Sequence, residues 1–184
     1  ICSGLVGSEM CIRDRGDFVV YVASVTESEV RLTLEVMVTM VNALDDGVLD
    51  ARSALQAAGF SRADGASAAS VDRLEQRLAV HADLLRRLPE LSTLDAARRV
   101  NEELTELPIS PAIVDHDEVG PHIHWTPATA TFDDQVLSDI LMALAQELCD
   151  NGTIRFGLCG AEGCERLFYD GTRNRSRRFC DCLL

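Results

Sequence analysis

The cysteines near the C-terminus are the residues of this chain whose types and spacing point most directly to chemistry. Four residues separate Cys159 from Cys164, and Cys180 and Cys182 follow after a basic segment. Zinc binds thiolates that converge on one tetrahedral point, so its cysteine pairs sit on tight turns joined by a hairpin. The spacing therefore predicts a Zn2+ site whose candidate ligands are Cys159, Cys164, Cys180 and Cys182.

The segment between these cysteine pairs is strongly basic. The chain carries a formal charge of −13, but residues 171–180 contain four arginines and no acidic residue, so the remainder carries −17. Arginine pairs with phosphate, and asparagine can read a base edge. The predicted nucleic-acid contacts are Arg173, Asn174, Arg175, Arg177 and Arg178. The alternative is a solvated tip whose arginines pair with Asp170 or with the acidic body. Phe168 and Phe179 are expected to form a small core behind the zinc, and the alternative is that they are stacking platforms for bases.

A second group with ligand chemistry lies in the middle of the chain. His122 and His124 are two residues apart on a predicted strand, so their side chains share one face. His116 and Asp117 precede them across a predicted turn, and the four residues could bind a metal or an acidic ligand. The alternative is a hairpin with ordinary histidines. No nucleophile elbow, phosphate loop or metalloprotease motif is present, so the chain is not expected to be an enzyme.

Hydrophobic spacing predicts the elements that position these residues. A capping box over 26–29 predicts a helix to about residue 44, although alternation over 30–40 equally fits a strand. Further helices are predicted over residues 50–58, 70–88, 94–107 and 131–150, with a loop over 61–67. Strands are predicted over residues 17–23, 112–115 and 122–126. The predicted fold is α+β: a mostly helical body with a small strand pair, plus a C-terminal zinc-ribbon-like hairpin.

Composition limits the class of protein. Hydrophobic residues make up 47% of the chain and charged residues 26%, as is usual for a globular domain. No apolar run approaches the roughly 20 residues that span a bilayer, so no membrane association is expected. The seven cysteines come without a secretion signal, which favours a cytoplasmic metal site over disulfides.

The residues around the cysteines resemble the CGNR zinc-finger family. The stretch from Cys159 to Cys180 follows the family's pattern C-x4-C-x-x-x-F-x-D-x-S/T-R-N-x-x-R-R-W/F-C. The family continues with Cys-Gly-Asn-Arg, whose cysteine would fall at position 185. The chain ends at Leu184, so the resemblance implies a finger cut short before this motif. The family is one of stress-induced bacterial transcription regulators, which implies zinc and DNA as ligands.

The rest of the chain divides by resemblance into two parts. Residues 16–152 resemble the ABATE domain that accompanies this finger, through Val41-Asn42, Val100-Asn101 and the segment from Asp115 to His124. That resemblance implies a stress-linked regulatory domain. Residues 1–15 resemble a translated sequencing adapter and are expected to be a non-native leader. The predicted domains are therefore this leader, an ABATE-like domain over 16–152 and a finger over 153–184.

These observations combine into one prediction with two alternatives. The chain is predicted to be a cytoplasmic transcription regulator that binds DNA through its finger, with a body that senses a small-molecule effector or forms a homodimer. The first alternative is a protein-interaction adapter whose arginine tip docks an acidic partner. The second is a metal-dependent enzyme centred on His116, His122 and His124.

Overall fold

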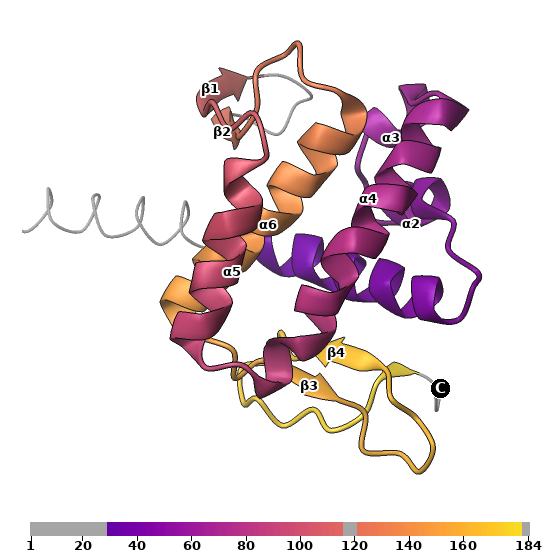
Figure 1. The fold of residues 1–184 in the computed structure, drawn as a ribbon, viewed down its shortest axis with the longest axis vertical. Coiled ribbons are helices and arrows are strands. Elements are labelled where there is room, and N and C mark those ends of the chain that lie inside the picture. The colour runs from indigo at the N-terminus through magenta and orange to yellow at the C-terminus, as the bar shows by residue number, and fades with distance from the viewer. Residues whose placement is uncertain (1–28, 116–120, 182–184) are drawn as a thin grey trace, which may run out of the picture.

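A computed structural model describes residues 29–115 and 121–181 (Figure 1). A first helix over residues 29–45 opens the described chain. The other α-helices are α2 (Ala51–Ala57), α3 (Arg62–Gly65), α4 (Ala68–Arg87), α5 (Thr93–Thr105) and α6 (Phe132–Asn151). A 3-10 turn, η1 (Leu88–Glu90), follows α4. The strands are β1 (Ala112–Asp115), β2 (Pro121–His124), β3 (Phe156–Leu158) and β4 (Leu167–Tyr169). These elements confirm the α+β prediction.

Several predicted features lie outside the described residues. They are the leader over 1–15, the strand over 17–23, the first residue of the capping box, and three candidate ligands, His116, Asp117 and Cys182.

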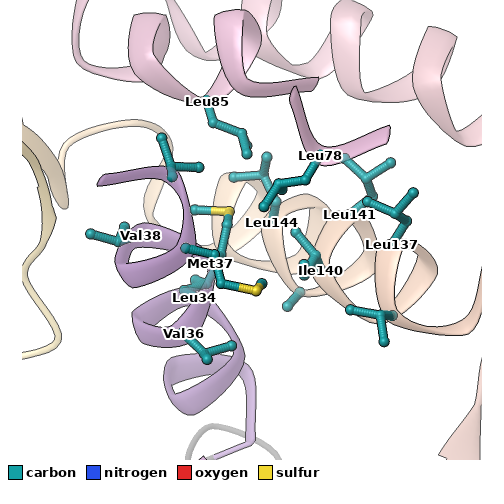
Figure 2. Close-up of a cluster of buried hydrophobic side chains, with 14 of the residues drawn as sticks. Leu34, Val36, Met37, Val38, Leu78, Leu85, Leu137, Ile140, Leu141 and Leu144 are labelled. Carbon is teal, nitrogen blue, oxygen red and sulfur yellow. The ribbon is translucent and has the colours of Figure 1, made fainter. Parts of the chain in front are cut away.

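Helix α6 forms the centre of the hydrophobic core and packs against both α4 and α5. The first helix crosses it, and Figure 2 shows Leu34 and Met37 of that helix beside Ile140 and Leu144 of α6. Positions 34, 37, 38 and 41 are all buried, which is the spacing of one helical face. The helical interpretation of residues 30–40 is therefore confirmed over the strand alternative.

Most predicted helix boundaries hold because polar side chains cap the helix starts. Ser67, Ser92 and Thr131 each accept a hydrogen bond from a backbone N–H in the first turn of α4, α5 and α6. Such a cap satisfies an N–H group that has no partner within the helix. Helix α6 ends at Asn151 and is capped by Gly152, whose φ of 69° suits glycine.

The predicted loop over residues 61–67 is wrong in part, because α3 occupies four of its residues. Ala63 is buried in the core and fixes this turn against the body. The guanidinium of Arg52 donates to the carbonyl oxygens of Ala63 and Ala66, at 3.0 and 2.6 Å. These tertiary contacts stabilise a turn too short to form alone, so local sequence did not predict it.

The two antiparallel strand pairs lie at opposite ends of the molecule (Figure 1). Pair β1–β2 stands beside the start of α6, and β3–β4 lies under η1 and the end of α4. All three residues of β4 are buried. Leu167 and Tyr169 join the main core with Phe156, whereas Phe168 joins a second cluster with Cys159 and Cys180. The two faces of β4 therefore link the helical body to the cysteines.

None of the helices in the described ranges 29–115 and 121–181 is long and apolar enough to cross a membrane.

Candidate zinc centre and arginine tip

The first two cysteines are brought together by a tight turn that follows β3. Cys159 extends the β3–β4 ladder by donating its N–H to the Arg166 carbonyl at 2.9 Å. The N–H of Cys164 then donates to the carbonyl of Ala161 at 3.1 Å. Gly163 has a φ of 75° in this turn, a conformation that favours glycine. The chain thus reverses within the C-x4-C motif and returns Cys164 toward Cys159.

The third cysteine arrives on a separate segment that runs beside the turn. Gly160 donates its N–H to the Arg178 carbonyl at 2.9 Å, and Cys180 donates its N–H to Cys159 Sγ at 3.4 Å. The Sγ atoms of Cys159, Cys164 and Cys180 all lie within 4.8 Å of one another. Among the described residues, these three cysteines are the only group of histidine, cysteine or acidic side chains close enough together to hold a metal ion.

The sulfur spacing fits a tetrahedral zinc ion. With Zn–S bonds of about 2.3 Å, two thiolates of a tetrahedral site lie about 3.8 Å apart. The Sγ atoms of Cys164 and Cys180 are 3.7 Å apart. Cys159 also has its pKa lowered to about 6, chiefly because the backbone N–H groups of Ala161 and Cys180 donate to its sulfur. The site therefore favours the thiolate that zinc requires.

The loop that follows β4, called the arginine tip, carries the arginines of residues 173–178, and the carboxylate of Asp170 stabilises its conformation. It accepts the N–H of Thr172 at 2.9 Å, the hydroxyl of Thr172 at 2.5 Å and the N–H of Arg177 at 2.7 Å. Burial raises the pKa of Asp170, but the Thr172 and Arg177 hydrogen bonds outweigh it and leave the pKa below its ordinary value. Asp170 thus joins the two ends of the loop that carries the arginines.

The predicted nucleic-acid residues divide into two groups. Arg173, Asn174, Arg175 and Arg178 are exposed. Arg175 has a φ of 48°, and its N–H faces the Thr172 carbonyl at 3.4 Å across a turn. No hydrogen bond or ion pair to a described residue occupies the guanidinium groups of Arg173, Arg175 and Arg178.

Arg177 differs from these three because its guanidinium is used within the finger. It donates to the Phe179 carbonyl at 2.9 Å and to Asp181 at 2.7 Å. It also lies over the Phe168 ring, 5.8 Å from the centroid. Through these contacts, Arg177 stabilises the loop next to the cysteines.

The finger is fixed to the first helix by one buried side chain. Asn42 donates through Nδ2 to the Leu167 carbonyl at 2.8 Å and accepts the Leu167 N–H through Oδ1 at 3.0 Å. The amide side chain thus satisfies both backbone groups of a β4 residue. Arg166 and Asp46 form an ion pair across the same junction. A cleft of about 560 Å³ lies there, with Glu35, Thr39 and Asp181 among its lining residues.

A buried polar group joins the other side of the finger to α6. Tyr169 donates its hydroxyl to Glu147 at 2.9 Å, and the Arg155 guanidinium lies 3.4 Å from the same carboxylate. Burial raises the pKa of Glu147, and burial together with Glu147 raises the pKa of Tyr169. Arg155 also donates to the Asp170 carbonyl at 2.8 Å, so this group supports the loop from below.

The histidines of β2 form a different kind of cluster. Their side chains share one face as predicted, with His122 Nε2 and His124 Nε2 3.1 Å apart. Arg62 lies 2.7 Å from His124 Nε2 and donates to Gln135 at 3.2 Å. Because a guanidinium only donates, His124 accepts this bond through Nε2. Burial raises the pKa of nearby Asp139 to about 6, against the opposing charges of Arg62 and His122. The cluster ties the hairpin to α3 and α6.

Sequence reasoning missed part of the site and misplaced one residue. The prediction of a small core behind the cysteines is confirmed for Phe168, which is 7% exposed, but is wrong for Phe179, which is 47% exposed. The sequence marks Asn42 only through the resemblance to the ABATE domain, and its one further signal is an asparagine among the apolar positions of the first helix. Nothing in the sequence connects Arg155 with Glu147.

The fold and the cysteine geometry define a zinc finger docked on a helical body. Residues 155–182 match the family model of the CGNR zinc finger. No curated protein matches the chain. The family match covers the finger, and the ABATE-like character of residues 16–152 stays a prediction.

Proposed function

We propose that this chain is a DNA-binding regulator that acts by binding rather than by catalysis. Zinc holds the loop that follows β4, and the loop offers Arg173, Arg175 and Arg178 to phosphate oxygens. Asn174 lies between Arg173 and Arg175 in the sequence and supplies an amide that reads a base edge. The helical body senses an effector or forms a homodimer, and the protein works in the cytoplasm.

The observation that carries this proposal is the contrast among the finger's arginines. Residues 155–181 hold six arginines and four acidic residues, so the finger is basic although the whole chain is at −13. Arg155, Arg166 and Arg177 pair with acidic side chains. The three arginines of the tip have no such pairing among the described residues, so they can displace counterions from phosphate.

Duplex binding measured across a range of salt concentrations tests the proposal. Each phosphate contact contributes about 0.9 unit to the slope of log K against log salt. Replacing Arg173, Arg175 and Arg178 with alanine should therefore flatten the slope by roughly three units, with zinc content unchanged. The matched control replaces Arg86, Arg98 and Arg99, which pair with acids on the body, and should keep the slope. Equal slopes for both triple variants would remove the proposal.

The adapter alternative uses the same tip but a different partner. An acidic protein also meets exposed arginines with opposite charge. Absence of duplex binding by the zinc-loaded chain at low salt, together with capture of an acidic polypeptide, would favour it. For the enzyme alternative, His122 and His124 bring no third metal donor into range among the described residues.

A further inference from the structure

The finger exposes one aromatic side chain beside its basic tip. Phe179 is 47% exposed, whereas Phe156, Phe168 and Tyr169 are all buried. Its neighbour Arg178 is exposed, and Arg173 and Arg175 lie in the same loop. A single exposed apolar residue is ordinary by itself, but an aromatic ring flanked by exposed arginines is the combination that proteins use to hold nucleic acid.

Main-chain hydrogen bonds hold the backbone of Phe179 in place. The carbonyl before it, on Arg178, accepts the Gly160 N–H at 2.9 Å. Its own carbonyl accepts from Arg177 Nε at 2.9 Å. Cys180, which follows it, belongs to the cysteine group. The backbone on both sides of the ring is thus anchored, so binding through Phe179 requires little further ordering of the main chain.

One edge of the ring rests against a residue that has no side chain. A methyl group placed at Gly160 would lie 3.5 Å from Cε1 of Phe179. The ring of Phe179 therefore lies beside the backbone of Gly160, and the residue is 47% exposed. An exposed aromatic ring on an anchored backbone can stack on another flat π surface.

From this arrangement we propose that Phe179 stacks on an unpaired base, so that the finger prefers nucleic acid with an unstacked nucleotide over an intact duplex. This inference rests on the proposed nucleic-acid function. Every base presents a flat π surface, and aromatic residues next to basic ones are the usual means of holding single strands. An acidic protein surface would satisfy the arginines, but it would not by itself favour a probe with an unpaired base over an intact duplex.

Fluorescence anisotropy with the full, zinc-loaded chain tests the preference. The probes are an intact duplex, the same duplex with one bulged thymidine, and the single strand. Wild type should bind the two probes with unpaired bases more tightly. Phe179→Leu keeps an apolar side chain but removes the π surface, and should weaken binding to those probes by roughly 5- to 100-fold while changing duplex binding less than about twofold. Ile154→Ala, at an exposed apolar residue just before the finger, is the control and should change neither.

A spectroscopic variant separates stacking from a structural role. The chain has one tryptophan, Trp125, so Trp125→Phe combined with Phe179→Trp places the only indole at the proposed contact. Its fluorescence should be quenched by the bulged duplex and much less by the intact one. No quenching, or an equal loss on all probes in Phe179→Leu, overturns the stacking proposal. If salt-dependent duplex binding persists in that case, the arginine proposal stands, and if no probe binds, both fail.

Discussion

The two strand pairs of this protein are similar in length but differ in what holds them. Pair β3–β4 has three residues in each strand and β1–β2 has four. Two short strands are not stable alone in water. In β3–β4, one face of β4 packs on the body and the other on the cysteines, so β4 is covered on both sides.

Pair β1–β2 is covered on one side only. Ile113 and Ile123 are cross-strand partners on its outer face, and they are 80% and 50% exposed. Its inner face meets the body through the polar contacts of Arg62 with His124. Pair β3–β4 is held in place by the cysteine group and by the buried side chain of Asn42. Pair β1–β2 is held by a few polar contacts, which we expect to stabilise it less. We therefore expect the stability of the finger to depend on its cysteines.

Loss of one cysteine should give the largest effect. Cys180→Ser removes a thiolate, and zinc should fall from about one ion per chain toward none because the remaining site is too poor. Apparent zinc-binding free energies in small fingers are about 10–16 kcal/mol at neutral pH, so β3–β4 should lose its order. Hydrogen exchange of the Leu167 amide would report this loss.

Cys149→Ser is the matched control for that variant. Cys149 is an exposed cysteine that lies outside the group of Cys159, Cys164 and Cys180. It should keep both zinc and amide protection. Retention of zinc by Cys180→Ser would contradict the assignment of Cys180 as a ligand.

The next effect concerns the attachment of the finger to the first helix. Asn42→Ala leaves the N–H and C=O of Leu167 buried without their partner, at a cost of about 1–3 kcal/mol for each group. We expect the free energy of unfolding to fall by roughly 2–4 kcal/mol in urea titrations. Asn101→Ala, at an exposed helical position, should stay within about 0.5 kcal/mol of wild type. Equal effects would show that Asn42 does not fasten the two parts.

A smaller effect is expected from the loop that Asp170 organises. Asp170→Asn weakens hydrogen bonds to a charged acceptor, worth about 1.5–3 kcal/mol each and partly kept by the amide oxygen. Because the folded-state pKa of Asp170 lies below its ordinary value of 3.8, its stabilising effect is present above that pH and is lost as the pH falls through the folded pKa. The stability difference between wild type and variant should therefore shrink below about pH 4. The exposed carboxylate Asp72, changed to asparagine, should show no comparable difference.

The sequence predicted those parts of the fold that local chemistry decides. Cysteine spacing, helix caps and apolar periodicity are local signals, so the meeting of Cys159, Cys164 and Cys180 and most of the helices were predictable. The alternation on β4 was hidden because Leu167, Phe168 and Tyr169 are all apolar and all buried. The body lies on one face of β4 and the cysteines lie on the other. Leu167 and Tyr169 therefore join the main core, whereas Phe168 joins the cluster around the cysteines.

Features that depend on distant partners were not predictable. The α3 turn depends on Arg52, and the two roles of the tip arginines depend on where Asp181 and Phe168 lie relative to Arg177. Four arginines in one short run look equivalent in sequence. Folding distinguishes them, because one is drawn into contacts within the finger and three are left exposed.

The smallest effect should come from the outer face of β1–β2. Ile113→Thr keeps a β-branched side chain, and because Ile113 is 80% exposed the free energy of unfolding should change by less than about 1 kcal/mol. Leu167→Thr is the corresponding change in β3–β4, where the side chain is 2% exposed. It should cost roughly 2–5 kcal/mol, because a buried leucine is lost and a hydroxyl is placed in the core. Urea titrations of both variants measure the difference directly. A cost for Ile113→Thr as large as that for Leu167→Thr would mean that the outer face of β1–β2 is covered in solution, and a dependence of that cost on protein concentration would identify a second copy of the chain as the cover.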